Sequence, residues 1–243
     1  MSKGLFVIGT GTDIGKTYVT GLLLKYLRDS GYNACYFKAA LSGAVKNPDG
    51  TLIPGDAVEV LSMANLDEDT DFVVPYVYET AVSPHLASRI EGHPVEMDVV
   101  RDAYSKVASK YDYVLMEGSG GIVCPIRYEG KDSKNNIMLE DIINELDLNV
   151  VLIADAGLGT INSVVTTCEY LKNRNIAVCG IIMNNYKDEI MEEDNVRMVE
   201  DITEISVIAK VYKNDKNPNF FRIFCQKQEK IRQNIIKMVF FSL

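Results

Sequence analysis

Histidine is scarce in this chain, and its cysteines show no pairing pattern. Only two histidines occur in 243 residues, so a histidine-rich metal centre is not expected. The cysteines are odd in number and scattered, without a C-x-x-C pair, which favours a reduced cytoplasmic protein without a disulfide framework. They are Cys35, Cys124, Cys168, Cys179 and Cys225.

Long apolar runs, internal repeats and low-complexity tracts are also missing. The apolar run in the N-terminal MSKGLFVIGTGT is too short for a signal peptide, and no apolar stretch reaches the length of a membrane span. No linker rich in proline, glycine or serine divides the chain. We therefore expect residues 1–243 to form one domain.

Positive charge is in deficit. The chain has 25 Lys and Arg against 34 Asp and Glu, a net charge of −9, with 47% hydrophobic residues. This composition is typical of a globular protein. The negative balance repels phosphate backbones and anionic lipid, so neither a nucleic acid nor a membrane is an expected partner. A small-molecule ligand is the better hypothesis.

Short apolar runs alternate with amphipathic segments. Strands are expected at 5–9, 34–38, 113–117, 150–155, 177–183 and 206–212, and helices at 16–29, 95–110, 139–146, 161–173 and 189–202. Most of the strand runs are near-continuous and aliphatic, as in strands buried on both faces of a parallel sheet. The alternation predicts an α/β fold with a doubly wound, mostly parallel sheet flanked by helices.

Unusual residues follow the predicted strands on one side only. GTGTDIGKT, KAALSG, EGSGG, DAGLGTIN and NNY come after strands, whereas the loops at the opposite edge, such as RDSGYN and KNRNI, are plain solvated connections. In parallel α/β sheets, ligands bind beyond the carboxyl ends of the strands. The chemistry is therefore expected at one rim.

GTGTDIGKT has the properties of a phosphate-binding loop of the P-loop type. Between a strand and a helix, glycines let backbone N–H groups point at an anion, and the helix N-terminus adds its dipole. Lys16 would reach the outer phosphates, and the Thr17 hydroxyl would ligate Mg²⁺. The loop is one residue longer than the usual spacing, because its first glycine is Gly9 instead of position 10. The alternative is a glycine-rich turn with a surface lysine, but the strand and helix context favours nucleotide binding. The expected nucleotide-binding residues here are Gly11, Thr12, Asp13, Ile14, Gly15, Lys16, Thr17 and Tyr18.

Two acidic residues and a second lysine are expected at the same rim. Glu117 ends a predicted strand, where a buried acid is costly unless it faces a cation. Asp56 in LIPGDAV, taken alone, is more often a helix N-cap than a metal ligand. Lys38 ends another strand, and the residues alone leave open a snorkelling surface lysine or an ammonium that faces the phosphates.

The order of the motifs resembles that of the dethiobiotin synthetase family. GTGTDIGKT, KAALSG, GDAV, SPH, EGSGGIVCPI, GLGTIN and GIIMNN span about residues 3 to 186. The resemblance implies an ATP- and Mg²⁺-dependent ligase that forms dethiobiotin from 7,8-diaminopelargonate and CO₂ in biotin synthesis. One amine captures CO₂ as a carbamate, the carbamate attacks the γ-phosphate of ATP, and the second amine displaces phosphate.

The resemblance also implies roles for single residues. Lys16 would hold the β- and γ-phosphates, and Lys38 would neutralise the carbamate and the γ-phosphate. Thr12 and Ser42 would contact the carbamate or the diamine. The implied Mg²⁺ ligands are Thr17, Asp56 and Glu117, the implied adenine contact is Asn184, and the implied substrate positions are Ser42, Gly121, Gly159, Thr160 and Asn162.

In the family the GLGTIN loop reaches the substrate of the neighbouring subunit, so a homodimer with sites at its interface is implied. A glycine turn at a helix N-terminus suits the substrate carboxylate, although Thr160 could instead merely cap that helix. Asn184, next to Asn185, could instead be a turn residue, which is the less favoured alternative. A helix that starts at Ser83 and Pro84 explains the SPH segment, so His85 is not assigned a catalytic role.

The chain departs from the family pattern in two places. Ala39 replaces the usual proline after the strand lysine. After residue 200, ISVIAKVYKNDKNPNFF lacks the expected glycine and proline of the adenine side, so use of other nucleoside triphosphates is a live hypothesis. Residues 213–243 are basic, and we expect a terminal helix that packs on the domain or on a dimer partner; a membrane surface or a partner protein is the alternative.

Three other functions are weighed against the ligase. Partition- or septum-positioning ATPases share the variant loop but carry a further lysine near its start, where this chain has Thr10, Gly11 and Thr12. Amidotransferase synthetases of cobalamin assembly need a glutaminase domain, for which there is no room. A nucleotide-binding module that has lost catalysis is disfavoured, because Lys16, Thr17, Lys38 and Glu117 are all intact.

Overall fold

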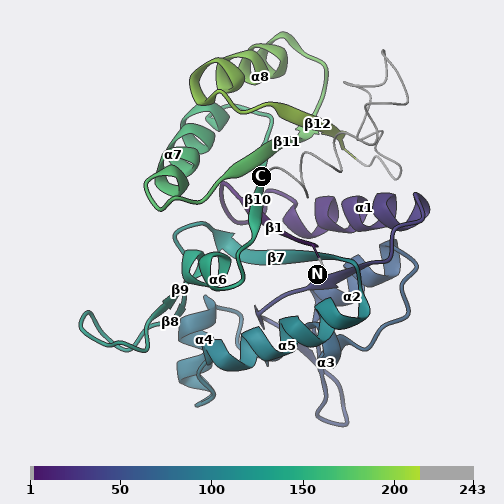
Figure 1. Ribbon diagram of the computed structural model, residues 1–243, viewed down its shortest axis with the longest axis vertical. Coiled ribbons are helices and arrows are strands. Elements are labelled where there is room, and N and C mark those ends of the chain that lie inside the picture. Colours follow the sequence, from purple (N-terminus) through teal and green to yellow (C-terminus); the bar gives the residue numbers. More distant parts are fainter. Residues whose placement is uncertain (1–2, 214–243) are drawn as a thin grey trace.

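A parallel sheet forms the centre of the computed structural model, which describes residues 3–213 (Figure 1). Within this part, six strands lie in the order β12-β11-β10-β1-β7-β2, and every neighbouring pair is parallel. They are β1 (Lys3–Gly9), β2 (Ala34–Phe37), β7 (Tyr113–Gly121), β10 (Asn149–Asp155), β11 (Val178–Tyr186) and β12 (Val207–Tyr212). The predicted α/β fold with a parallel sheet is confirmed.

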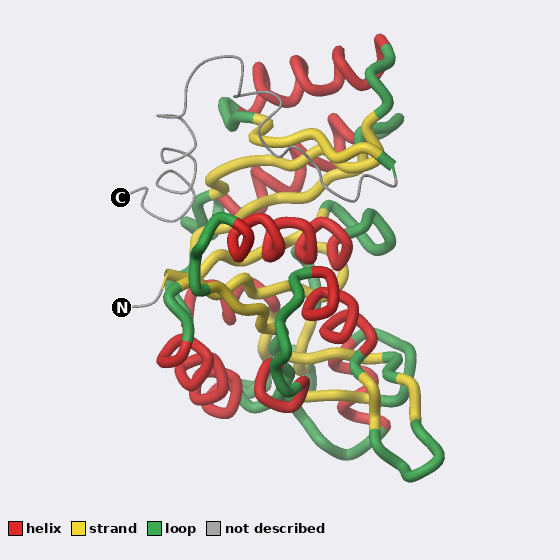
Figure 2. The backbone as a smooth tube through the Cα atoms, turned by 90° about the vertical axis from the view of Figure 1, so that its right-hand side faces the viewer, coloured by secondary structure: helices red, strands yellow, loops and turns green. Residues whose placement is uncertain are grey.

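Helices pack on both sides of the sheet (Figure 2), so its central strands are almost free of solvent contact. The longer helices are α1 (Lys16–Asp29), α2 (Gly55–Met63), α5 (Met97–Lys110), α7 (Thr160–Lys172) and α8 (Ile190–Thr203), and the shorter ones are α3 (Thr70–Val73), α4 (Pro84–Ile90) and α6 (Leu139–Glu145). Burial on both faces is what the unbroken aliphatic runs predict. No helix within residues 3–213 is long and apolar enough to cross a bilayer.

Among the described residues, three short strand pairs lie outside the main sheet. They are β3 (Ala40–Ser42) with β6 (Tyr76–Tyr78), β4 (Val45–Lys46) with β5 (Leu52–Ile53), and β8 (Pro125–Arg127) with β9 (Ile137–Met138). Strands of two or three residues are too short to show a periodic pattern, so the sequence did not predict them.

Two main strands run further toward the rim than predicted. β7 continues through the glycines of EGSGG, because Gly121 pairs with Gly9 of β1. β11 continues through Asn184 to Tyr186. The rim therefore consists partly of strand backbone, which holds its side chains more firmly than a loop does. The predicted C-terminal helix lies, apart from Lys213, outside the described residues.

Candidate functional site

The phosphate-binding loop joins the end of β1 to the start of α1 (Figure 1). Two of its residues have left-handed backbone, Asp13 with φ 58° and Gly15 with φ 84°. A Cβ on Gly9 would lie 2.5 Å from the Cδ1 atom of Ile14 and 2.9 Å from carbons of Lys16. The loop thus curls back over the end of β1, and a side chain at position 9 would require those of Ile14 and Lys16 to move.

The lysine of this loop is folded back onto the loop itself. The Nζ atom of Lys16 donates a hydrogen bond of 2.7 Å to the carbonyl oxygen of Gly11. Burial lowers the pKa of Lys16 below that of an ordinary lysine, and the negative charge of Glu117 only partly opposes this effect. The hydrogen-bond acceptor of Lys16 here is a neutral backbone carbonyl, which a charged acceptor could replace.

A second ammonium lies between two carboxylates. Lys38, only 4% exposed, follows β2 and donates to Oε1 of Glu117 at 3.0 Å and to Oδ2 of Asp56. The hydroxyl of Thr17 donates to the same Glu117 oxygen at 2.9 Å. Burial alone would lower the pKa of Lys38, but the charges of Glu117 and Asp56 outweigh it and raise that pKa. The Lys38 ammonium is thus the common partner of the two carboxylates among the predicted metal ligands.

Neighbouring strands and helix starts bring these side chains together. β7 pairs with β2, which places Glu117 beside the end of the lysine strand. Asp56 lies in the first turn of α2, whose N-cap is Pro54, so its interpretation as the helix cap is wrong. The interpretation of Lys38 as a snorkelling surface lysine is also wrong, because its side chain is buried.

Tyr36 belongs to this cluster and was not among the residues predicted from the sequence. Its side chain is fully buried, and its hydroxyl donates to Oε2 of Glu117 at 3.1 Å. In sequence it looks like one more apolar residue of a buried strand. The available clue was its spacing, because a strand residue two positions before Lys38 lies on the same face of the sheet.

A cavity of about 270 Å³ opens beside the phosphate loop. Among the residues predicted from sequence, those that line it are Thr12, Asp13, Gly15, Lys16, Thr17, Lys38, Ser42, Asp56 and Glu117. Leu41, Gly118, Ser119 and Gly120 also line it and were not predicted. The Ser42 hydroxyl donates to the carbonyl oxygen of Val82 at 2.6 Å. Both lysines, both carboxylates and the two hydroxyls of Thr12 and Ser42 thus share one space.

Several predicted residues support the loop without lining this cavity. Gly11 accepts the Lys16 hydrogen bond, and a Cβ on Gly121 would lie 3.7 Å from the Cα atom of Gly11. Ile14 and Tyr18 do not line the cavity either.

Asn184 contacts the loop from β11. Its Nδ2 atom donates to the carbonyl oxygen of Ile14 at 2.8 Å, and its Oδ1 atom is buried without a hydrogen-bond partner among the described residues. Its interpretation as a turn residue is wrong, since it lies within the strand. The left-handed residue is the neighbouring Asn185, with φ 58°.

The start of α7 lies apart from this cavity. Gly159 is the N-cap with φ 91°, and Thr160 is the first helical residue, so the interpretation of Thr160 as the cap is wrong. The Thr160 hydroxyl is buried and has no hydrogen-bond partner within residues 3–213. None of Gly159, Thr160 and Asn162 lines the phosphate-loop cavity of their own chain. The adjacent Leu158 is 95% exposed.

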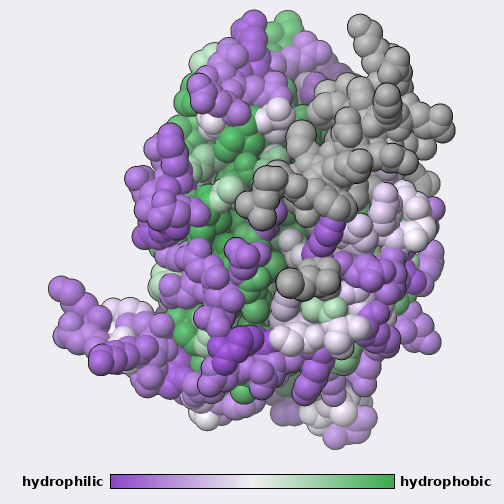
Figure 3. All heavy atoms as spheres, viewed as in Figure 1, coloured by the Kyte–Doolittle hydropathy of each residue, from purple (hydrophilic) through white to green (hydrophobic). Residues whose placement is uncertain are grey.

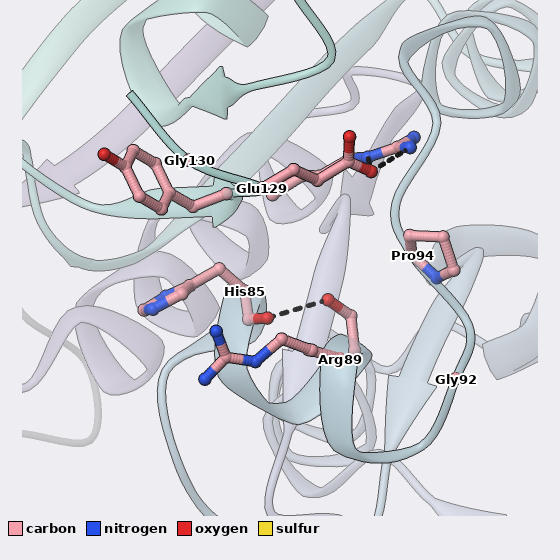
Figure 4. Close-up of a pocket in the computed structure, with 9 residues that line it drawn as sticks. His85, Arg89, Gly92, Pro94, Glu129 and Gly130 are labelled. Atoms are coloured by element: carbon pink, nitrogen blue, oxygen red, sulfur yellow. Dashed lines mark hydrogen bonds and ion pairs between the residues drawn. The ribbon is translucent and has the colours of Figure 1, made fainter. Parts of the chain in front are cut away.

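A second cavity, of about 560 Å³, lies between α4 and the end of β8 (Figure 4). His85 and Arg89 project from α4 on one side, and Glu129 lies across from them. Arg127 is paired with Glu129 and Glu96, so its charge is already neutralised. The expected helix start is confirmed, with Ser83 as N-cap and Pro84 as first residue, and Nδ1 of His85 lies 3.0 Å from the Ser83 hydroxyl.

Comparisons with known proteins agree with this geometry. The family model of the AAA domain matches residues 3–218. The ATP-dependent dethiobiotin synthetase BioD of Clostridium novyi is 50% identical over 220 residues, which are 90% of this chain and 91% of that protein. The protein of the same name from Brachyspira hyodysenteriae is 47% identical, over 87% of this chain and 92% of its own.

Among solved structures, the MinD cell division protein of Aquifex aeolicus matches 98% of this chain and 95% of its own with a TM-score of 0.53. Its sequence is only 14% identical, so this likeness concerns the fold alone.

Proposed function

The chain belongs to the ATP-dependent dethiobiotin synthetase family, and from that premise we propose that the cavity beside its phosphate loop is the site of the family's reaction. The protein is an ATP-dependent ligase of biotin biosynthesis. The single observation that carries the site is the convergence of Lys16, Lys38, Asp56 and Glu117 on one cavity. The likeness to MinD adds no argument for a switch ATPase, because it concerns only the fold.

The reaction needs positioning and charge neutralisation more than a protein nucleophile. One amine of 7,8-diaminopelargonate adds to CO₂, drawn from bicarbonate, and loses a proton to give a carbamate. A carbamate oxygen then attacks the γ-phosphorus of ATP and ADP leaves. The second amine attacks the carbonyl carbon of the resulting anhydride, which closes the ureido ring of dethiobiotin and releases phosphate.

Each polar group of the cavity has a part in this scheme. Lys16 exchanges the carbonyl of Gly11 for the β- and γ-phosphates, a stronger acceptor for an ammonium group. Lys38 neutralises the negative charge that develops between the carbamate and the γ-phosphate. The hydroxyls of Thr12 and Ser42 line the same space and would orient the carbamate or the diamine.

The residues present suit Mg²⁺. A magnesium ion in a phosphate site is held by one or two carboxylates and by substrate oxygens, and it keeps several waters. Asp56, Glu117 and the Thr17 hydroxyl offer such oxygens, and the contact of the Lys38 ammonium with the two carboxylates supports the placement of a cation there. Within residues 3–213, no group of three or more His, Cys, Asp or Glu is placed to hold a metal ion. When bound, the ion would offset the charge of the triphosphate.

Asn184 is proposed to contact the base of the nucleotide. Its amide nitrogen is committed to Ile14, and its unpartnered oxygen is an acceptor for an exocyclic amine such as that of adenine.

A homodimer completes the proposal. The loop and first turn of α7 suit a substrate carboxylate but do not reach the cavity of their own chain. Leu158 in this loop is almost fully exposed, and Figure 3 shows apolar side chains gathered around α6 and α7. A second copy would cover such a surface. The cytoplasmic location expected from the cysteine pattern is part of the same proposal.

The decisive experiment is a synthesis assay with the purified protein. It is incubated with 7,8-diaminopelargonate, bicarbonate, Mg²⁺ and ATP, and dethiobiotin is sought by mass spectrometry. We expect dethiobiotin, ADP and phosphate in equal amounts. ATP hydrolysis without dethiobiotin would contradict the proposal and favour a nucleotide-dependent switch.

A further inference from the structure

The hydroxyl of Tyr36 lies in the interior of the sheet, where a polar group is costly unless it has a partner. That partner is Oε2 of Glu117, at 3.1 Å. A phenylalanine would pack in the same space without the hydroxyl, and the next residue, Phe37, is as deeply buried. Packing alone therefore does not account for the tyrosine.

We propose that Tyr36 is a positioning residue that fixes the carboxylate of Glu117 for metal binding. The inference rests on the proposed function, in which Glu117 is a magnesium ligand. Tyr36 itself touches neither the nucleotide nor the diamine in this scheme, so it acts through Glu117 alone.

The sheet register explains why a tyrosine reaches this carboxylate. Tyr36 is paired with Leu115 across β2 and β7, so Glu117 is its diagonal neighbour on the same face. Diagonal neighbours lie about 7–8 Å apart, a span that only long or aromatic side chains bridge. A phenol crosses this distance and presents its O–H at the far end.

The two oxygens of Glu117 have separate partners. Oε1 accepts from Thr17 and Lys38 on the cavity side, and Oε2 accepts from Tyr36 on the interior side. Because Oε2 is held, the carboxylate cannot turn freely, and Oε1 stays directed at the place where a cation is bound. Outer hydrogen bonds of this kind orient metal ligands, and their loss typically weakens metal binding about 10- to 100-fold.

The test is the Tyr36→Phe variant, with Mn²⁺ as a spectroscopic substitute for Mg²⁺. Binding of Mn²⁺ is measured by electron paramagnetic resonance in the presence of a non-hydrolysable ATP analogue. We expect the Kd for Mn²⁺ to rise about 10- to 100-fold. In the synthesis assay, the Mg²⁺ concentration for half-maximal rate should rise by a similar factor, while kcat at saturating Mg²⁺ changes much less.

Tyr78→Phe is the matched control. Tyr78 is equally buried, and its hydroxyl donates to the carbonyl oxygen of His93 at 2.6 Å, away from the cavity. The Tyr78→Phe protein should bind Mn²⁺ with the same Kd as the unaltered protein. Equal Kd values for Tyr36→Phe and Tyr78→Phe would overturn the inference.

A double variant gives a second test, which separates an effect through Glu117 from a general loss of structure. In a Glu117→Gln background, the side chain at position 117 carries no charge, so the Tyr36→Phe change should cost no further Mn²⁺ affinity. An additional loss in the double variant would contradict the inference. Mn²⁺ binding is measured without diamine, so failure of the proposed synthesis remains distinguishable from failure of this assignment.

Discussion

At the scale of single residues, Lys38 neutralises the buried carboxylate of Glu117, which is only 2% exposed. Removing one partner of a buried pair typically costs about 3–5 kcal/mol of folding free energy. Lys38→Met should therefore lower the unfolding temperature. Added Mg²⁺ should raise the unfolding temperature of this variant by more than it raises that of the unaltered protein. Loss of this ammonium should also lower kcat by about 100- to 1,000-fold. Thermal melts with and without Mg²⁺ and the synthesis assay measure both effects.

The control for this substitution is Lys46→Met. Lys46 forms a 2.9 Å ion pair with Glu79 in which both side chains are about half exposed. Surface pairs of this type contribute about 0–1 kcal/mol, so neither stability nor turnover should change appreciably. Near-normal turnover in Lys38→Met would remove that lysine from the proposed mechanism.

The lowered pKa of Lys16 predicts that nucleotide binding depends on pH. Burial lowers its pKa, so its ammonium loses its proton at a lower pH than an ordinary lysine does. The affinity for ATP should therefore fall as the pH rises through this lowered pKa. A guanidinium keeps its charge over that range, so Lys16→Arg should abolish the pH-dependent fall. Titrations of ATP binding at several alkaline pH values, for both proteins, check the prediction.

Asn184 predicts which bases are accepted. Its free acceptor oxygen suits a base with an exocyclic amine, as in ATP and CTP, and opposes the carbonyl oxygen of guanine. Turnover with CTP should thus be appreciable and turnover with GTP low, and Asn184→Ala should reduce the difference. Strict use of ATP would reject the idea of relaxed selectivity, and efficient use of GTP would reject the assigned contact.

At the scale of elements, the turn from the phosphate loop into α1 depends on Gly15. It has φ 84°, and a Cβ there would lie 2.3 Å from Nδ2 of Asn184. Gly15→Ala should cost about 1–2 kcal/mol in backbone strain and weaken ATP binding by displacing Asn184. Gly31→Ala is the control, because Gly31 has φ 85° with open space around it. Denaturation curves should show a loss of stability in both variants, whereas only Gly15→Ala should raise the KM for ATP; an equal KM would contradict this prediction.

The elements with clear periodicity were predictable from sequence, and the contacts between them were not. β1 and α1 were found because an unbroken apolar run is followed by glycines and a helical pattern. Glu117 was found because an acid at the end of a buried strand is costly unless it faces a cation, whereas the role of Lys38 was implied by the family resemblance. Tyr36 was missed because its partner is set by the pairing of β2 with β7, a register that local sequence does not specify. The short pairs, such as β3 with β6, depend in the same way on distant contacts.

At the scale of the whole molecule, the proposed homodimer gives a further prediction. Leu158→Glu would place a charge on the loop before α7 that is expected to face the second copy, so the dimer should dissociate and turnover should fall. The control is Ile202→Glu. It alters another exposed apolar residue, in the last turn of α8, and should leave the dimer intact. Sedimentation analysis distinguishes the two variants. A Leu158→Glu protein that stays dimeric and active would exclude this loop from the interface.

The single-domain organisation of residues 1–243 also stays a prediction.

In the resting cavity, the carboxylates of Asp56 and Glu117 share a single lysine, Lys38. A nucleotide that drew this lysine away without supplying a replacement would strand two carboxylates next to its own phosphates. We expect free ATP and inorganic phosphate to bind poorly for that reason, whereas a nucleotide already complexed with magnesium would supply positive charge in place of the lysine. We therefore expect the site to prefer a nucleotide that arrives with its own cation over one that arrives without it.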